Sequence, residues 1–234
     1  MADQGRILAI AVCAFALSGA TLAATRTYDT GAFEQVSVAA GVDVDISLGA
    51  RQVTADTKSD NFDDLLITVK DNELRIERPA GSWFSGWLWP RPSYKVRVVT
   101  PALHSLKASS GSDVTIKGIL DGDLSVSASS GSDVDVSLVK GGNVTLHASS
   151  GSDMEIDGSC ASLKVDASSG SDIDADDLRC ENVSIQVSSG SDVSVTATKS
   201  VTGSVSSGAD VKIKGKPPAV QVEKSSGGNF VLGE

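Results

Sequence analysis

A five-residue motif, Ser-Ser-Gly-Ser-Asp, recurs along the second half of the 234-residue chain. It first occurs at 109–113, and the last two copies are altered to Ser-Ser-Gly-Ala-Asp and Ser-Ser-Gly-Gly-Asn. Successive copies begin 18 to 20 residues apart. A repeat of nearly constant length predicts a solenoid, in which each repeat is one structural unit stacked on the next.

Two short runs of alternating apolar and polar residues flank each motif. Leu124, Val126 and Ala128 precede one copy, and Val134 and Val136 follow it. This period of two is typical of β-strands with one buried face. Gly supplies the positive φ angle of a tight turn, and the Ser and Asp side chains can bond to nearby backbone amides. We therefore expect an all-β fold, a single-stranded and right-handed parallel β-helix with coils about 4.8 Å apart.

Stacked coils would bring the acidic ends of the motif into one row. The carboxylates of this row are Asp113, Asp133, Asp153, Asp172, Asp192 and Asp210. Two like charges 4.8 Å apart repel by about 0.9 kcal/mol in water, so the row must be hydrated, hydrogen-bonded or neutralised. Either each Asp caps its own corner, or Ca²⁺ binds along the row. Repeats that bind Ca²⁺ have a shorter period that is richer in Gly, which favours capping.

The first 23 residues have the composition of a secretory signal peptide. Arg6 precedes an apolar run at 7–17, and small residues predict cleavage after Ala23, with Ala20 as the alternative. The run is short for a membrane span, so an uncleaved anchor is the less favoured interpretation. We expect an exported protein, periplasmic or released to the cell surface, without a transmembrane anchor after cleavage.

Cys160 and Cys180 are 20 residues apart, which is one coil. Equivalent Cα atoms of neighbouring coils should lie about 4.8 Å apart, within the range that a disulfide bond requires. In an oxidising compartment we expect the two residues to pair. The alternative is two buried free thiols.

The mature chain divides into two parts. Residues 24–104 predict degenerate N-terminal coils and a cap, and residues 105–234 predict regular coils. Within the first part, the apolar runs on either side of Asp71-Asn72 predict a hairpin or a widened coil. At the other end, the run at 230–232 (Phe-Val-Leu) is a candidate to close the last coil.

A segment at 80–93 interrupts the strand pattern. It holds Trp83, Phe84, Trp87 and Trp89, and so all three tryptophans of a chain with 4% aromatic residues. One interpretation is a hydrophobic flap over a sheet or over the solenoid end. The other is an exposed platform for a glycan, a protein partner or a membrane interface.

Charge and composition exclude several classes of function. The net charge of −10 excludes nucleic acid as the main partner. The two histidines, His104 and His147, are two coils apart, and the chain has no Gly-x-Ser-x-Gly motif and no phosphate-binding loop. Cleavage of a polysaccharide by clustered carboxylates is the remaining enzymatic alternative. No cofactor is expected apart from Ca²⁺.

Three motifs together resemble a known family. They are Val-x-Val-x-x-Gly-Val-x-Val-x-Ile at 36–46, the repeated Ser-Ser-Gly-Ser-Asp, and Ser-Ser-Gly-Ala-Asp-Val-Lys-Ile-Lys-Gly-Lys-Pro-Pro at 206–218. Over residues 33–232 the chain resembles the head GIN domain family, whose members are described as "putative auto-transporter adhesins". That family usually has Ser-Gly-Ser-Gly where this chain has Ser-Gly-Ser-Asp, so the acidic row is a feature of this chain.

The resemblance implies an exported, non-catalytic β-helical protein of the cell envelope. Such a protein would be an adhesin or binding module, with an envelope protein or a glycan as its partner. A spacer stiffened by Ca²⁺ and a polysaccharide-active enzyme are the alternatives. The resemblance brings no catalytic residues to this chain.

Overall fold

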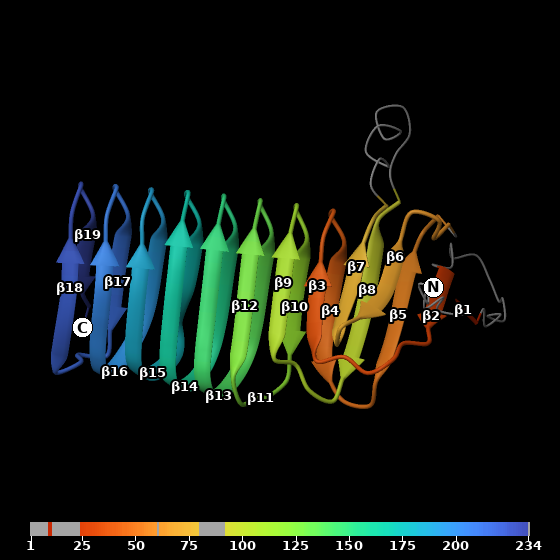
Figure 1. The fold of residues 1–234 in the computed structure, drawn as a ribbon, viewed down its shortest axis with the longest axis horizontal. Helices are drawn as coiled ribbons and strands as arrows, with labels where there is room; N and C mark the ends of the chain where they lie inside the picture. The colour runs from red at the N-terminus through yellow and green to blue at the C-terminus, as the bar shows by residue number, and fades with distance from the viewer. Residues whose placement is uncertain (1–8, 11–23, 60, 80–91, 234) are drawn as a thin grey trace.

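The computed structural model describes residues 9–10, 24–59, 61–79 and 92–233. All regular elements among them are β-strands, and none of them forms a helix suited to crossing a membrane. The strands build a β-solenoid of about 6 turns with coils of ~20 residues, and Figure 1 shows these coils side by side along one rod. The parallel β-helix is therefore confirmed, while its right-handedness stays a prediction.

The N-terminal strands are β1 (Ala9–Ile10), β2 (Ala24–Tyr28), β3 (Gln35–Val38), β4 (Asp43–Leu48), β5 (Gln52–Thr57), β6 (Leu66–Lys70), β7 (Glu73–Glu77) and β8 (Tyr94–Thr100). The regular coils contain β9 (Ser105–Ser109), β10 (Asp113–Lys117), β11 (Leu120–Asp121), β12 (Leu124–Ser129), β13 (Asp133–Ser149), β14 (Asp153–Ser168), β15 (Asp172–Val187), β16 (Asp192–Val205), β17 (Asp210–Lys214), β18 (Ala219–Lys224) and β19 (Asn229–Leu232).

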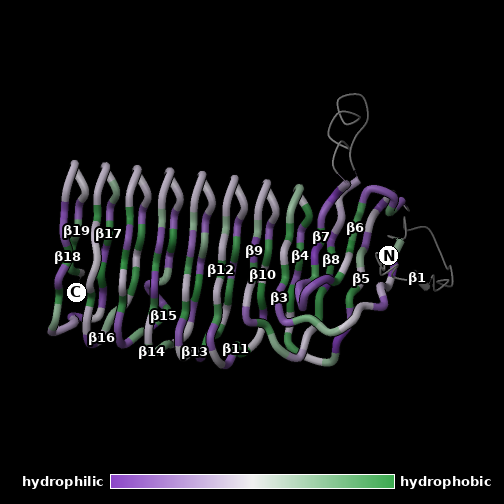
Figure 2. Tube along the Cα trace, in the orientation of Figure 1, coloured by the Kyte–Doolittle hydropathy of each residue, from purple (hydrophilic) through white to green (hydrophobic). Residues whose placement is uncertain are grey.

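The regular coils stack in register, parallel and one repeat apart. Val126 pairs with Leu146, which pairs with Val165 and then with Ile185. These four side chains point inward and are at most 1% exposed. Figure 2 shows the alternation of apolar and polar residues along the coils. Because one coil alone cannot cover its apolar face, stacking buries a continuous core along the rod.

The second corner of the coils from β13 to β16 has no separate linking segment. The strands β13 to β16 continue through it, and a register shift between Val136 and Val139 marks the bend in β13. Leu138 and Gly158 adopt positive φ angles of 64° and 129° there. At Gly158 a Cβ atom would lie 2.1 Å from the carbonyl oxygen of Val139, so the close approach of two coils requires glycine.

The N-terminal cap is built around the first coil. The strands β3 and β4 form this coil, because they pair in parallel with β9 and β10. The strands β6 and β7 form an antiparallel hairpin, so the hairpin interpretation of residues 65–76 is confirmed. Next, β7 adds in parallel to β3, and β8 adds in parallel to β4. Two further strands, β5 and β2, pair antiparallel beyond β8 and cover this end of one sheet.

Most of the expected signal peptide lies outside the described residues. Within 1–23 only β1 is described, and it pairs antiparallel with β2. Signal cleavage therefore stays a prediction.

Candidate functional site

The serine–glycine corners position the candidate site. In the first corner Ser110 and Gly111 have φ angles of 59° and 69°, as in the type I′ turns that join tightly spaced strands. The corners also bond to one another, because the Gly111 N–H donates to the carbonyl of Ser130 in the next coil at 3.1 Å. The residue that follows each turn therefore repeats at the same place in every coil.

The third serine of the motif, and not the aspartate, caps the corner. Ser132 and Ser152 are 0% exposed, and their hydroxyl oxygens accept from the N–H groups of Ser129 and Ser149 in their own corners at 3.0 and 3.1 Å. The same hydroxyls donate to carbonyls of the preceding coil, those of Ala108 and Ala128, at 3.1 and 3.0 Å. Among the described residues, no corner carboxylate accepts a hydrogen bond. Capping by Asp was therefore the wrong expectation, since strand alternation turns the serine inward and the aspartate outward. The carboxylates are left free for other contacts.

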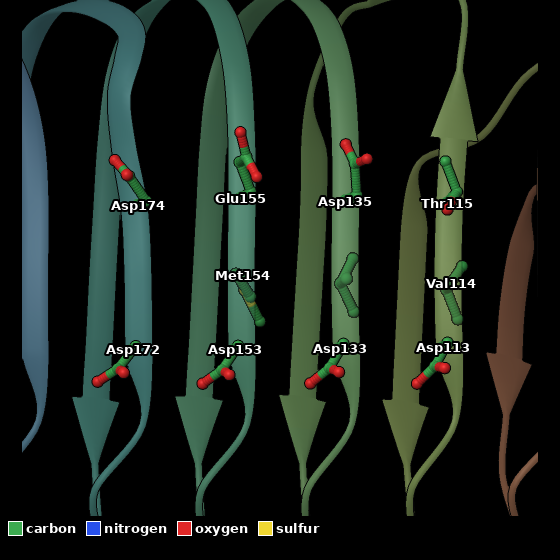
Figure 3. Close-up of a pocket in the computed structure, with 11 residues that line it drawn as sticks. Asp113, Val114, Thr115, Asp133, Asp135, Asp153, Met154, Glu155, Asp172 and Asp174 are labelled. Atoms are coloured by element: carbon green, nitrogen blue, oxygen red, sulfur yellow. The ribbon is translucent and has the colours of Figure 1, made fainter.

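The corner carboxylates form one continuous row. The register pairs their Cα positions directly along six coils: Asp113, Asp133, Asp153, Asp172, Asp192 and Asp210. All six side chains are exposed. Figure 3 shows four of them aligned on neighbouring strands and pointing away from the core. The predicted alignment is confirmed by the register.

A second acidic row runs beside the first. Asp135, Glu155 and Asp174 occupy matching positions on β13, β14 and β15, two residues after the corner row. The second row and the first four carboxylates of the corner row line a hollow of about 440 Å³ on this sheet. We call the nine carboxylates of both rows the acidic face. The outward side of the opposite sheet is mainly uncharged, with Thr145, Ser184 and Thr202 around a hollow of about 380 Å³.

Partial burial, and then repulsion along the corner row, perturb three of its carboxyl groups. Partial burial, and then the charges of Asp172 and Asp133, raise the pKa of Asp153. The same causes raise the pKa of Asp113, where the charges are Asp43 and Asp133, and the pKa of Asp192, where they are Asp172 and Asp210. Each of these groups therefore favours a proton or an external cation more than an isolated Asp does.

Cationic side chains lie beside the acidic face as well as at the ends of this sheet: Lys117 is on β10, and Lys212 on β17 follows Asp174 and Ser194 in the register of the second row. Lys95 on β8 pairs with Asp45 at 2.9 Å, and Lys214 on β17 pairs with Asp176. None of the nine carboxylates of the acidic face has a salt bridge to a described residue. The face thus has a large uncompensated negative charge.

The described residues contain no group of three or more His, Cys, Asp and Glu side chains that could hold a metal ion. This geometry does not favour the predicted Ca²⁺ sites, which no observation tests directly. The histidines lie apart from the acidic face: His147 Nδ1 is 3.7 Å from the Asp166 carboxylate, and His104 Nδ1 is 3.3 Å from the carbonyl oxygen of Asp123.

Cys160 and Cys180 form a disulfide bond between neighbouring coils, as predicted. Their Cα atoms are 4.5 Å apart and paired in register. Gly141 and Ala197 occupy the same row on either side, so the bond lies in a row of small residues.

The binding residues proposed in the Trp-rich segment, Trp83, Phe84, Trp87 and Trp89, lie outside the described residues. The ends of the segment are described and firmly held. Arg78 donates to the Asp64 carboxylate and to the carbonyl of Pro92, both at 2.8 Å. The Tyr94 hydroxyl donates to the same carboxylate. Since β7 and β8 pair with β3 and β4, these ends lie on the edge that carries the serine–glycine corners.

Sequence reasoning missed two features of the candidate site, one at the ends of the Trp-rich segment and one at the end of the acidic rows. The Arg78–Asp64–Tyr94 cluster joins residues from three separate segments, and no local pattern indicates it. The extension of the acidic rows onto the first coil, through Asp43 and Asp45, was visible in the run Val42-x-Val44-x-Ile46. Aligning that run with Val114-x-Ile116 would have revealed it.

The comparisons with known proteins agree with this architecture. The family described as "Putative auto-transporter adhesin, head GIN domain" matches residues 32–217. The chain belongs to this family. No curated protein matches the sequence.

Three solved structures share the fold. A putative adhesin from Bacteroides fragilis NCTC 9343 superposes with a TM-score of 0.80 at 17% identity, over 91% of this chain and 98% of that one. A putative adhesin from Parabacteroides merdae ATCC 43184 gives 0.70 at 11% identity, over 91% and 96%. A putative lipid binding protein from Parabacteroides distasonis ATCC 8503 gives 0.68 at 16% identity, over 89% and 96%. At these identities the likeness shows the fold alone.

Proposed function

We propose that this head GIN domain protein is an exported, non-catalytic binding module of the cell envelope that holds a cationic protein partner on its acidic face. The observation that carries the proposal is the double row of carboxylates without salt bridges. Family membership and the disulfide bond support export and binding to an external partner. A surface with one sign of charge attracts and orients partners of the opposite sign.

The uniformity of the face favours binding over catalysis. Acid–base catalysis by two carboxylates requires environments that push their pKa values apart. Here the pKa values of Asp113, Asp153 and Asp192 are all raised, by partial burial and by neighbouring aspartates. Evenly spaced, equivalent carboxylates suit a series of contacts with ammonium or guanidinium groups.

The test is binding of the full chain to immobilised poly-lysine, with heparin as a polyanionic control. The face variant replaces Asp133, Asp135 and Asp153 with Asn and Glu155 with Gln. We expect wild-type binding to weaken with added salt, and the face variant to bind at least about tenfold more weakly, since each charged contact is worth about 1 kcal/mol or more.

The control variant has the same net charge as the face variant. It replaces four exposed aspartates that lie away from the acidic face and form no salt bridge with a described residue: Asp29, Asp63, Asp71 and Asp121. It should bind almost as the wild type does. If both variants weaken binding equally, net charge alone is responsible and the acidic face is not the binding surface.

The same experiment reports on the Trp-rich segment. Because Trp83, Trp87 and Trp89 are the only tryptophans, tryptophan fluorescence, excited where tyrosine does not absorb, comes from this segment alone. We propose the segment as a second contact surface, since its ends are fixed on the same edge as the corner row. A blue shift of the emission on binding, together with weaker binding by the triple Trp→Ala variant, supports this role. Unchanged emission removes the segment from the contact.

A further inference from the structure

The last coil of the solenoid is stacked on one side only. Among the described residues, β18 pairs with β16 and β19 pairs with β17, and neither has a second neighbour. Their outer edges therefore present unpaired backbone N–H and C=O groups. Both strands lie at the C-terminal end of the rod in Figure 1.

Apolar side chains of the core are uncovered at this end. Val220 continues the row of Val201, and Leu232 continues the row of Ile213. Val201 and Ile213 are fully buried, but Val220 is 40% and Leu232 is 55% exposed. The expectation that 230–232 closes the last coil holds only for Phe230, which packs against the core. Val231 and Leu232 are exposed, because they belong to a strand whose own outer side is open.

The outward side chains also change character in the last coil. The corner row ends with Asn229 in place of Asp, and the second row ends with Val231, which is 50% exposed. Strand β18 has one Glu and one Lys, and β19 has no charged residue. In a chain with a net charge of −10, this neutral coil is the part that two copies can bring together without repulsion.

The two ends of the rod have different shapes. At the C-terminal end both sheets stop at the same coil. At the N-terminal end one sheet continues beyond β4 through β8, β5 and β2, while the other continues beyond β3 through β7 and β6. The C-terminal end, where both sheets stop at one coil, cannot pair along both strands with the N-terminal end, where they do not. Two C-terminal ends can pair along both strands.

We propose that the last coil is an interface between two copies of this chain, joined end to end about a two-fold axis. In such a dimer β18 pairs antiparallel with the partner's β18, and β19 pairs antiparallel with the partner's β19. The pairing satisfies the open edges and covers the uncovered core residues. The resulting rod leaves the acidic faces of both copies free.

The positions of the side chains select the register of this pairing. Residues directly opposite in an antiparallel pair lie on the same face of the sheet, so inward residues must meet inward residues. Val222 and Val231 are each three positions from the corner residues Ser225 and Gly228, which a hydrogen bond of 2.9 Å joins. An axis perpendicular to both sheets can therefore pass through Val222 and Val231 together.

This register places inward residues opposite inward residues on both strands. On β18, Val220 lies opposite the partner's Lys224, whose aliphatic stem can cover it. Phe230 lies opposite the partner's Leu232, Val231 opposite the partner's Val231, and Gln221 opposite the partner's Glu223. An axis one residue closer to the corner would place Glu223 opposite the partner's Glu223. An axis one residue further away would leave Phe230 without a described partner. The contact is one coil wide and smaller than a standard interface of about 1,600 Å², so we expect a concentration-dependent dimer.

The test is sedimentation velocity of the full chain from about 1 μM to about 100 μM, a range that covers weak association. We expect a monomer–dimer equilibrium. Val231→Lys places two like charges on the axis and should give a monomer, and Val231→Glu should do the same. Mixing the two variants should restore the dimer, because opposite charges then meet. Leu138→Lys is the matched control: Leu138 is an apolar residue on a middle coil, 54% exposed, and its variant should dimerise as the wild type does.

Small-angle scattering provides the shape. The end-to-end dimer requires a maximum dimension close to twice that of the monomer. A wild-type monomer at all concentrations, a Val231→Lys variant that still dimerises, or a mixture that stays monomeric would each overturn the proposal. A compact side-by-side dimer, or filaments that grow with concentration through head-to-tail contacts, would overturn it as well.

Discussion

Two kinds of glycine occur along the solenoid. Gly151 lies in a serine–glycine corner with a φ of 66°, and a Cβ atom there would meet nothing within 4 Å. Gly203 lies in β16 with a φ of 138°, and a Cβ atom there would lie 1.8 Å from the carbonyl oxygen of Ile185. The corner requires glycine for its backbone angle alone, whereas β16 requires it for space between coils.

These environments predict unequal effects of the same substitution. Gly151→Ala should lower the free energy of unfolding by about 1 kcal/mol, the cost of a left-handed conformation. Gly203→Ala should cost about 3 kcal/mol or more, because the backbone of two stacked coils must separate. Urea unfolding followed by far-UV circular dichroism measures both. Equal losses in the two variants would contradict the close approach at Gly203.

At the scale of the element, the disulfide bond joins two coils in the middle of the array. Cys160 and Cys180 close a loop of one coil, and both side chains are buried. Linking residues 20 apart restricts the unfolded chain and contributes about 3 kcal/mol by the chain-entropy estimate. Because each coil contacts only its neighbours, the effect should concentrate on β14 and β15.

Replacing both cysteines with Ala tests this contribution. Alanine fits the row, since Gly141 and Ala197 are the neighbouring residues. We expect a lower urea midpoint and faster hydrogen exchange in β14 and β15 than in β12. Reduction of the wild type should reproduce the change, and reducing agent should not affect the double variant. An unchanged midpoint would show that stacking alone holds these coils.

The elements also show how far the sequence predicts the fold. The period of the motif gave the coils and their register, because one repeat equals one coil and identical corners must align. Strand alternation also determines that Ser132 points inward and Asp133 outward, although capping was assigned to the wrong side chain. The bend at Leu138 could not be predicted, since it depends on a register shift between coils rather than on a turn motif. The closing role assigned to 230–232 holds for Phe230 but not for Val231 and Leu232, because a strand at the end of a stack leaves its own outer side open.

At the scale of the whole molecule, repulsion within the acidic face works against the fold. Three of its carboxyl groups, Asp113, Asp153 and Asp192, have raised pKa values, mainly through partial burial and then through neighbouring charges. Glu73 in the cap is the opposite case: burial alone would raise its pKa, but hydrogen bonds from Lys107 and Arg75 outweigh this effect and lower it. The acidic face and the cap therefore respond to pH in opposite directions.

The sign of the pH effect follows from these shifts. A carboxyl group with a raised pKa binds protons more readily in the folded chain than in the unfolded chain, so its contribution to stability increases as the pH falls toward the usual value of 3.8. The contribution of Glu73 is present above its usual value of 4.5 and is lost as the pH falls through its lowered pKa. The groups of the acidic face outnumber Glu73. The Tm at low ionic strength should therefore rise between pH 7 and about pH 4.

Asp153→Asn and added cations separate the causes of this rise. The corner row already has an asparagine at its end, Asn229. Asp153→Asn should raise the Tm at pH 7 by a few degrees and make the Tm depend less on pH and on salt. Asp121→Asn, away from the acidic face, should change neither. If cations act by screening, Ca²⁺ and Mg²⁺ at equal ionic strength raise the wild-type Tm equally. A larger rise with Ca²⁺ that EDTA reverses would instead support calcium binding along the corner row. A fall in the Tm of Asp153→Asn would contradict this account, because both the partial burial of Asp153 and the neighbouring charges make its negative charge unfavourable.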